Sequence, residues 1–342
     1  MPDASEAPPG PRFTVGYQPL NGEPDYFSDI VRDYRDAIAE VYFAAPGEPS
    51  GRSPVPVSAE AQTLEELAWI RSQGIRLHLL LNAACDGGHA LSAAFADGVA
   101  DRVCRWLDRT GLDGVTVFSP FLARMIRARF PGLELRASVN LRIGTVSALR
   151  QTAPFFDSYT IQRERNRDPE RLAAFRKWAA AEGKSLVVLA NSGCLNYCAF
   201  QSFHDNVIAH EDEIRRAPDS ALLPTLCRSH FADPANRADF LRGSWIRPED
   251  VRAHHRITGA LYKLATRQHG RPRIVIGAYA RGRFHGNLAD LLEPGHGPAF
   301  EPCLFANGCF PPDWFERTLC GDRICETCRY CDGVLDQVCR RA

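Results

Sequence analysis

Short apolar runs alternate with amphipathic stretches along most of the chain. The runs have the length of buried strands, and most of the stretches between them place apolar residues three and four positions apart, as on one helix face. The run 76–82, for example, contains four leucines. These runs predict seven strands, at 13–17, 40–44, 76–82, 114–118, 133–139, 158–161 and 185–190.

The amphipathic stretches predict the intervening helices. Ser58 is a candidate N-cap and Gly74 a stop signal for one of them. An eighth strand, within 261–267, comes only after the long stretch 194–253. The predicted helices are 26–38, 58–73, 90–109, 121–130, 146–156 and 169–181.

Eight such β units imply a parallel sheet, either closed or doubly wound. The first turn between a strand and a helix, Gln18 to Gly22, lacks the G-x-G-x-x-G pattern of a Rossmann sheet. We therefore predict an α/β fold of the TIM-like (β/α)8 barrel type with a cysteine-rich C-terminal tail. The predicted organisation is a disordered lead-in at 1–12, a barrel at 13–292 with an insertion at 194–253, and an irregular extension at 293–342.

Composition and charge narrow the class of protein. The chain has 342 residues, 45% of them hydrophobic, and 41 basic residues balance 41 acidic ones. This is an ordinary globular composition, and the charge balance gives no argument for binding nucleic acid or membrane surfaces. No apolar run reaches membrane-spanning length, and the N-terminus lacks the basic and apolar regions of a signal peptide. We expect a cytoplasmic protein without a membrane partner.

Polar side chains follow several predicted strands. In a barrel of this type the active site lies at the carboxyl ends of the strands, and arginines there suit carboxylate-bearing ligands. Cys85, Arg142, Glu164, Cys194 and Lys263 share these positions. The candidate substrate-binding residues are Asn82, Asn140, Arg163, Arg165, Asn191 and Arg267.

The cysteines indicate metal chemistry. A reducing compartment disfavours disulfides, so several of the 12 cysteines are candidate ligands. Cys194 and Cys198 follow the seventh strand four positions apart, and with Cys227 they form a candidate site whose fourth ligand we expect to be Cys85. Cys303, Cys309 or a tail cysteine are the alternatives for that position, whereas Cys104 lies within a helix and is expected in the core.

The tail carries the more specific spacing. Cys320, Cys325, Cys328 and Cys331 form C-x4-C-x2-C-x2-C, and C-x4-C-x2-C is an iron–sulfur spacing. A zinc site is the alternative, although zinc sites usually pair two C-x2-C units across a longer loop. We therefore predict one or two iron–sulfur clusters, with zinc as the alternative cofactor, and thiolate ligands favour either over hard cations.

Other catalytic patterns are weak or absent. His210-Glu211 begins like H-E-x-x-H, but Ile214 occupies the position of the second histidine. The sequence contains no G-x-S-x-G and no P-loop. Cys85 and His89 are a further nucleophile–base candidate, and His204 is a candidate ligand or acid–base group.

Several short pieces together resemble the peptidase U32 family of collagenase-like proteins. They are Ile161 to Glu164, Asn191 to Cys194, Arg247 to Asp250, and Tyr262 to Arg267, which is similar to the family's Lys-Ile-x-Gly-Arg. The resemblance extends over most of the chain up to about residue 292. It implies a TIM-like barrel with a 4Fe–4S cluster held by cysteines at its mouth. The sequence departs from the family in its cysteine spacing, in Thr266 where the family has glycine, and in its tail cluster.

The resemblance also implies a choice of activities. The family was first named for proteolysis, but several members hydroxylate small molecules or RNA bases without oxygen, using an organic oxygen donor. We therefore expect an iron–sulfur oxidoreductase or hydroxylase acting at the barrel mouth on a small molecule or RNA base. The alternatives are a U32-type peptidase and a zinc-stapled binding protein without activity. A homologous partner in a heterodimer, or an electron donor, is conceivable.

Overall fold

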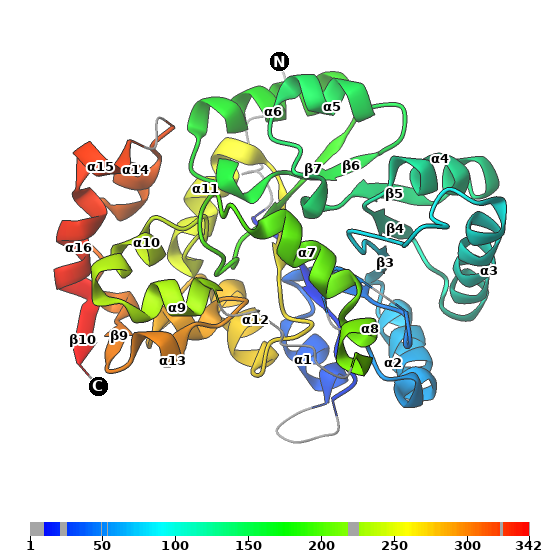
Figure 1. Cartoon of the computed structure of the whole chain (residues 1–342), viewed down its shortest axis with the longest axis horizontal. Coiled ribbons are helices and arrows are strands. Elements are labelled where there is room, and N and C mark those ends of the chain that lie inside the picture. The colour runs from blue at the N-terminus through cyan, green and yellow to red at the C-terminus, as the bar shows by residue number, and fades with distance from the viewer. Residues whose placement is uncertain are drawn as a thin grey trace, which may run out of the picture.

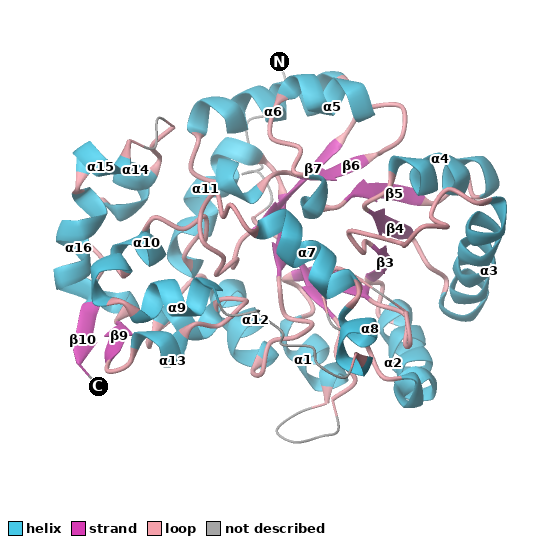
Figure 2. Ribbon diagram, viewed as in Figure 1, coloured by secondary structure: helices cyan, strands magenta, loops and turns pink. Residues whose placement is uncertain are grey.

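Eight parallel strands close into a barrel at the centre of the molecule (Figures 1 and 2). The computed structural model describes residues 10–20, 26–48, 50–52, 54–217, 226–321 and 324–341. Neighbours in sequence are neighbours in the barrel, and β1 pairs with β8 to close it. The strands are β1 Phe13–Gly16, β2 Ile38–Phe43, β3 Arg76–Leu81, β4 Gly114–Val117, β5 Glu134–Ala137, β6 Ser158–Thr160, β7 Ser185–Leu189 and β8 Leu261–Leu264.

Helices cover the outside of the barrel. Their termini follow local chemistry, because Ser92 and Asp168 cap the starts of two of them through side-chain oxygens and Gly111, in the left-handed conformation (φ 69°), ends the helix that Ser92 begins. The predicted (β/α)8 barrel is confirmed. The surrounding helices are α1 Phe27–Tyr34, α2 Glu60–Ser72, α3 Ala93–Thr110, α4 Pro120–Arg129, α5 Val146–Thr152, α6 Pro169–Ala181, α11 Val251–Thr258 and α12 Pro272–Arg281.

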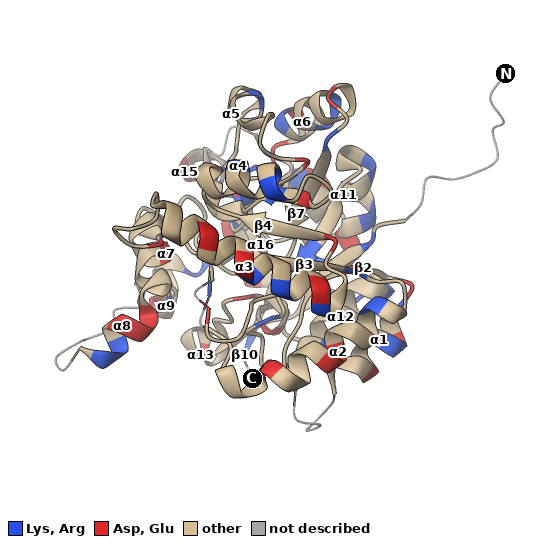
Figure 3. Ribbon diagram, turned by 90° about the vertical axis from the view of Figure 1, so that its right-hand side faces the viewer, with Lys and Arg blue, Asp and Glu red and all other residues tan. Residues whose placement is uncertain are grey.

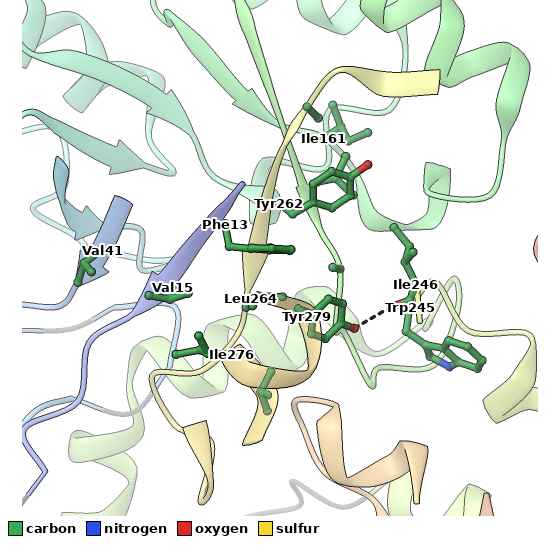
Figure 4. Close-up of a cluster of buried hydrophobic side chains, with 14 of the residues drawn as sticks. Phe13, Val15, Val41, Ile161, Trp245, Ile246, Tyr262, Leu264, Ile276 and Tyr279 are labelled. Atoms are coloured by element: carbon green, nitrogen blue, oxygen red, sulfur yellow. Dashed lines mark hydrogen bonds between the residues drawn. The ribbon is translucent and has the colours of Figure 1, made fainter. Parts of the chain in front are cut away.

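The main core lies between the strands and these helices. Figure 4 shows this packing where β1 and β8 meet α12. The ring of Phe13 lies 6.1 Å from that of Tyr279, whose hydroxyl donates a 2.7 Å hydrogen bond to the carbonyl of Ile246. The burial of these large side chains stabilises the barrel and anchors the loop that enters α11.

The barrel interior below the mouth holds a charge-compensated polar network. Glu40 accepts hydrogen bonds from the guanidinium of Arg136 and from the hydroxyl of Thr14. His78 lies 3.1 Å from the same carboxylate, and Arg136 also binds Glu134. Glu40, His78 and Glu134 bring three ligand-type atoms within 4.8 Å of one another. Arg136 pairs with both carboxylates and Arg76 lies 2.5 Å from Glu134, so two guanidiniums balance the two carboxylates and this cluster is a structural network.

The later part of the insertion, residues 226–241, and the C-terminal extension lie together on one side of the barrel, whereas the earlier part, residues 201–216, crosses in front of the barrel in the same view (Figure 1). The extension contains helices and a two-stranded antiparallel sheet, so it is more regular than predicted. The insertion contains α7 Gln201–Ala209, α8 Glu211–Arg216, α9 Leu226–Ala232 and α10 Ala238–Leu241. The extension contains α13 Gly297–Phe300, β9 Cys303–Phe305, α14 Trp314–Thr318, α15 Cys325–Cys328, α16 Tyr330–Val338 and β10 Cys339–Arg341.

Two cysteine predictions require correction. A disulfide joins Cys303 and Cys339 across the pair of strands β9 and β10, although disulfides were not expected. Cys303 is therefore no candidate for the fourth upstream ligand. Cys104 is exposed on α3, because the buried stripe of that helix runs through Val99, Val103 and Trp106.

The outer surface carries mixed charge. Figure 3 shows acidic and basic residues interspersed along helices such as α3, in keeping with the balanced composition. Among the described residues, no helix combines the length and apolarity required to cross a membrane. Most of the predicted lead-in, residues 1–9, lies outside the described part of the chain.

Candidate functional site

A pocket opens at the carboxyl ends of the barrel strands, where the fold places active sites. Its empty volume, open solvent included, is about 570 Å³. We call it the mouth pocket. It is lined by Tyr42, Gly51, Arg52, Leu80, Asn82, Val139, Asn140, Arg163, Leu189, Lys263, Ala265, Arg267, Gln268 and Glu293.

Four of the six candidate substrate-binding residues line this pocket. They are Asn82, Asn140, Arg163 and Arg267, which come from the ends of four different strands. The side-chain oxygen of Asn82 also accepts a 3.1 Å hydrogen bond from the backbone of Gly51, which holds the loop after β2 over the pocket.

Asn191 and Arg165 do not line the mouth pocket. Asn191 is fully buried, and its amide group bonds the backbone of Ala265 and the carbonyl of Leu291 at 2.6–3.3 Å. It is therefore a structural bridge, and its prediction as a substrate ligand is not supported. Arg165 lies 3.4 Å from Asp168 at the start of α6, outside the pocket lining.

Cations outnumber anions in the mouth pocket. Arg52, Arg163, Lys263 and Arg267 line it, and the one carboxylate in the described lining is Glu293, 3.6 Å from Arg52. Arg163 and Arg267 are almost completely buried. Burial lowers the pKa of Arg267 to about 10, and its guanidinium donates to Ser50 at 2.9 Å. Such a pocket favours a ligand that brings negative charge.

Lys263 lies at the centre of this charged set. Its amine sits 4.1 Å from the centre of the Tyr42 ring, whose hydroxyl donates to the carbonyl of Leu264 at 2.8 Å. Burial, together with neighbouring guanidiniums such as those of Arg136 and Arg267, lowers the pKa of Lys263 to about 7. A large fraction of the amine is therefore neutral at physiological pH.

Two residues, Thr266 and Gly16, allow the ends of β1 and β8 to pack closely beside the mouth pocket. Thr266, where the U32 pattern has glycine, is buried, and its hydroxyl accepts from the backbone N–H of Gly16 at 2.7 Å. A Cβ at Gly16 would lie 2.6 Å from the backbone nitrogen of Arg267, so the end of β1 requires glycine. Thr266 thus ties β1 to β8 directly below Arg267.

Glu293 reaches the pocket through a strand-like pairing with the motif that follows β7. The N–H of Gly193 donates to the carbonyl of Glu293, and the N–H of Glu293 donates to Asn191, both at 2.9 Å. A Cβ at Gly193 would lie 2.3 Å from the carbonyl of Pro294, so only glycine permits this approach. Burial raises the pKa of the Glu293 carboxyl.

Three of the four predicted upstream ligands gather beside the mouth pocket. Burial raises the pKa of Cys227, and the neighbouring thiolates of Cys194 and Cys198 raise it further. The guanidinium of Arg163 lies 3.3 Å from the sulfur of Cys194 while it also lines the pocket. We call Cys194, Cys198 and Cys227 the upstream thiols.

Cys85 does not join the upstream thiols. A hydrogen bond with His210 lowers the pKa of Cys85, and the same contact raises the pKa of His210. The other ring nitrogen of His210, Nδ1, lies 3.2 Å from the carboxylate of Glu213. His89, the base expected for Cys85, instead packs its ring against Phe95 at 5.4 Å.

The tail cysteines line a second pocket. Its empty volume, open solvent included, is about 420 Å³. We call it the tail pocket. Burial raises the pKa of Cys331 to about 11, and the thiols of Cys325 and Cys320 contribute in the same direction. Its lining contains Cys320, Cys325, Cys328 and Cys331 together with Arg167, Arg242, Arg317, Thr318, Ile324, Arg329, Tyr330 and Asp332.

Arg167 connects the tail pocket to the barrel. It donates hydrogen bonds to the carbonyls of Leu241 and Trp245, and its guanidinium lies over the rings of Trp245 and Trp314 at 4.6 and 5.3 Å. The two indole rings stack 5.7 Å apart. Arg167 therefore joins three segments, because it belongs to the loop after β6 and contacts both the insertion and the extension.

Both thiol groups offer soft ligands of the kind that iron–sulfur clusters and zinc ions accept. Arg163 lies beside Cys194, and the tail pocket places Arg167, Arg242, Arg317 and Arg329 around its four cysteines. These guanidiniums suit the negative charge of a thiolate-ligated centre.

The sequence did not indicate Arg52, Glu293 or Arg167 as site residues. Arg52 lies in a loop outside any predicted element, and Glu293 follows the predicted end of the barrel. Arg167 stands among other charged residues before α6. The one feature of the sequence that could have indicated Arg167 is the cluster of charged residues that follows β6.

Neither a protein-family model nor a curated protein matches the sequence. Among solved structures, the U32 peptidase Mk0906 superposes with a TM-score of 0.54 at 14% identity, over 78% of this chain and 96% of that chain. This likeness shows that the two proteins share a fold, as the resemblance in the sequence implied. Eubacterium rectale Amy13B (TM-score 0.38, 10% identity, 59% and 63% coverage) and β-methylaspartase from Clostridium tetanomorphum (0.35, 10%, 60% and 52%) match with lower scores.

Proposed function

We propose that this protein is an iron–sulfur enzyme that acts on a small carboxylate-bearing molecule in the mouth pocket. One observation carries the proposal: Arg163 contacts the sulfur of Cys194 and lines the mouth pocket with the same side chain. A cluster held by the upstream thiols would thus be separated from a bound ligand by a single guanidinium.

The thiols are suited to such clusters. The upstream thiols supply three ligands, and the fourth position is left to a group outside this set. The tail thiols supply four ligands and would hold a second cluster. An iron–sulfur cluster supplies electron transfer or activation of an oxygen-bearing group. Because the pKa of Cys331 is raised to about 11, loading the tail site should release a proton at neutral pH.

The residues of the mouth pocket would bind and orient the substrate. Arg163 and Arg267 offer bidentate donors to a carboxylate, and Arg52 lines the same pocket. The amides of Asn82 and Asn140 offer both donors and acceptors to a hydroxyl or carbonyl. Binding is expected to be strong because these groups act in a partly buried site.

Oxygen-independent hydroxylation is the reaction that we propose in particular. It agrees with the U32-like fold and with thiol ligands beside an anion-binding pocket. A small-molecule substrate is favoured over an RNA base, because the overall charge is balanced and two of the pocket cations, Arg163 and Arg267, are buried. Hydroxylation removes two electrons from the substrate, and an organic oxygen donor would take them up as it gives up its oxygen. The tail cluster would relay electrons that prepare the upstream site.

Anaerobic purification followed by iron, sulfide and zinc analysis tests this proposal. Two four-iron clusters predict about eight irons and eight sulfides per chain with a visible absorption band. Cys227→Ser and Cys328→Ser should each remove about half of the iron. Cys104→Ser, which changes an exposed thiol on α3, is the matched control. Zinc without iron, or unchanged iron in both variants, would contradict the proposal.

A thiol hydrolase is the second candidate. Cys85, His210 and Glu213 form a nucleophile, base and orienting carboxylate in series, and the hydrogen bond from His210 lowers the pKa of Cys85. This arrangement agrees with the name of the U32 peptidase structure. Peptide hydrolysis that is abolished by Cys85→Ala and kept in Cys104→Ala would favour it. Equal activity of both variants would eliminate it.

A further inference from the structure

The chain contains only three lysines among its 41 basic residues. Lys177 is exposed on α6, and Lys184 precedes β7 at the opposite end of the barrel. The third, Lys263, lies on β8 in the mouth pocket, where every other cation is an arginine. A guanidinium supplies charge and hydrogen bonds but no nucleophile at neutral pH. A lysine at this one position therefore indicates a need for an amine.

The surroundings of Lys263 suit a reactive amine. Its nitrogen lies over the face of Tyr42, and no ion pair with a carboxylate is formed among the described residues. A buried lysine that only stabilised the fold would normally be paired with an anion. Arg136 and Arg267 repel its positive charge, Glu40 opposes them, and burial disfavours the ammonium most strongly.

The rest of the mouth pocket suits a 2-oxo acid. Arg163 and Arg267 line the pocket and would bind the carboxylate there, which would place the adjacent ketone in the pocket that Lys263 lines. Glu293 lines the same pocket 3.6 Å from Arg52, so its carboxylate is placed to accept and return a proton during the step.

We propose that Lys263 forms an imine with the keto group of a 2-oxo acid held by the pocket arginines. The neutral amine attacks the carbonyl carbon, a C–N bond forms, and the carbonyl oxygen takes up a proton. The amine nitrogen then loses its protons as the hydroxyl group leaves as water. The balance is amine plus ketone to imine plus water, and no oxidant or reductant is consumed.

This inference shares only the mouth pocket with the proposed function and requires no cluster. Iron analysis tests the clusters, whereas imine formation is tested by chemical trapping of the polypeptide. Each can fail while the other stands.

The experiment is reductive trapping with cyanoborohydride and peptide mapping by mass spectrometry. The probes are pyruvate, 2-oxoglutarate and phenylpyruvate at neutral pH. The expected product with pyruvate is one carboxyethyl group on the peptide that contains Lys263. Acetone, which has the ketone but no carboxylate, should leave that peptide unmodified, because the arginines then have nothing to bind.

Matched variants separate this site from general amine reactivity. Lys263→Met should abolish the modification, whereas Lys177→Met, which changes an exposed lysine, should keep it. Mapping of the unaltered protein gives the answer even if Lys263→Met folds poorly, because it identifies the modified amine directly. Modification spread over Lys177, Lys184 and the N-terminus, or no adduct on Lys263 with any of the three acids, would overturn the proposal.

Discussion

Asn191→Ala removes a side chain that bridges two strand ends and a returning loop. Its amide makes three hydrogen bonds, two with the backbone of Ala265 and one with the carbonyl of Leu291, and the residue is fully buried. Each bond contributes about 1 kcal/mol net, and each buried backbone group left without a partner costs about 1–3 kcal/mol. The free energy of unfolding should therefore fall by about 3–5 kcal/mol.

The assay is urea unfolding at pH 7 followed by tryptophan fluorescence. Asn206→Ala is the matched control, because the amide of Asn206 makes a 2.9 Å bond to Ser202 on the exposed surface of α7. Its free energy of unfolding should change by less than about 0.5 kcal/mol.

Asn191→Asp sharpens the test. It keeps the oxygen that accepts from Ala265 but replaces the donor with a second acceptor facing the carbonyl of Leu291. It should be at least as destabilising as the alanine variant at neutral pH. If both variants of Asn191 kept the stability of the parent protein and instead weakened ligand binding, the structural role would be refuted and the original expectation of a substrate ligand restored.

Three further perturbations follow from the structure. Burial raises the pKa of Glu40, but its charged partners outweigh burial and lower the pKa to about 2. The stabilisation that Glu40 contributes is therefore complete above about pH 4.5 and is lost as the pH falls through about 2. Glu40→Gln should lower the free energy of unfolding at neutral pH and make it less dependent on pH under acid conditions, as measured by urea unfolding. Burial lowers the pKa of His254 to about 4 from 6.5, so the folded state loses stability as the pH falls from about 6.5 to about 4, and His254→Gln should reduce that loss in the same titrations. Gly16→Ala would place a Cβ 2.6 Å from the backbone of Arg267 and should cost about 1–3 kcal/mol by urea unfolding, whereas Gly10→Ala, with nothing within 4 Å, should be silent.

The barrel could be predicted because its strands are buried on both faces. Such strands appear as short continuous apolar runs, and the run at β3 was placed within one residue of its observed end. The polar residues inside the barrel did not obscure this pattern, because Glu40, His78 and Arg136 each stand alone between apolar neighbours. The regular alternation of predicted strands and helices then indicated a parallel barrel.

The candidate site was predicted only in part, for a physical reason. Residues at strand ends, such as Asn82 and Arg267, could be assigned to the mouth because all parallel strands end at one face. Asn191 also follows a strand end, but its side chain bonds the carbonyl of Leu291 within the protein instead of entering the pocket. A shift of one residue along a strand reverses the direction of the side chain, and the sequence pattern does not locate strand ends that closely. Cys85 contacts His210 at the C-terminal end of α7, a pairing that the spacing of the cysteines does not encode.

The position of Asn191 also bears on when the protein becomes functional during synthesis. Its contacts require the end of β7, the end of β8 and the segment at Leu291, so they cannot form until the ribosome has released most of the chain. The strand-like pairing that brings Glu293 to the pocket has the same requirement. A chain that leaves the ribosome N-terminus first can therefore form most of its barrel strands long before it can complete the mouth pocket. Any cofactor delivered to the upstream thiols would find the mouth pocket incomplete during translation and complete afterwards.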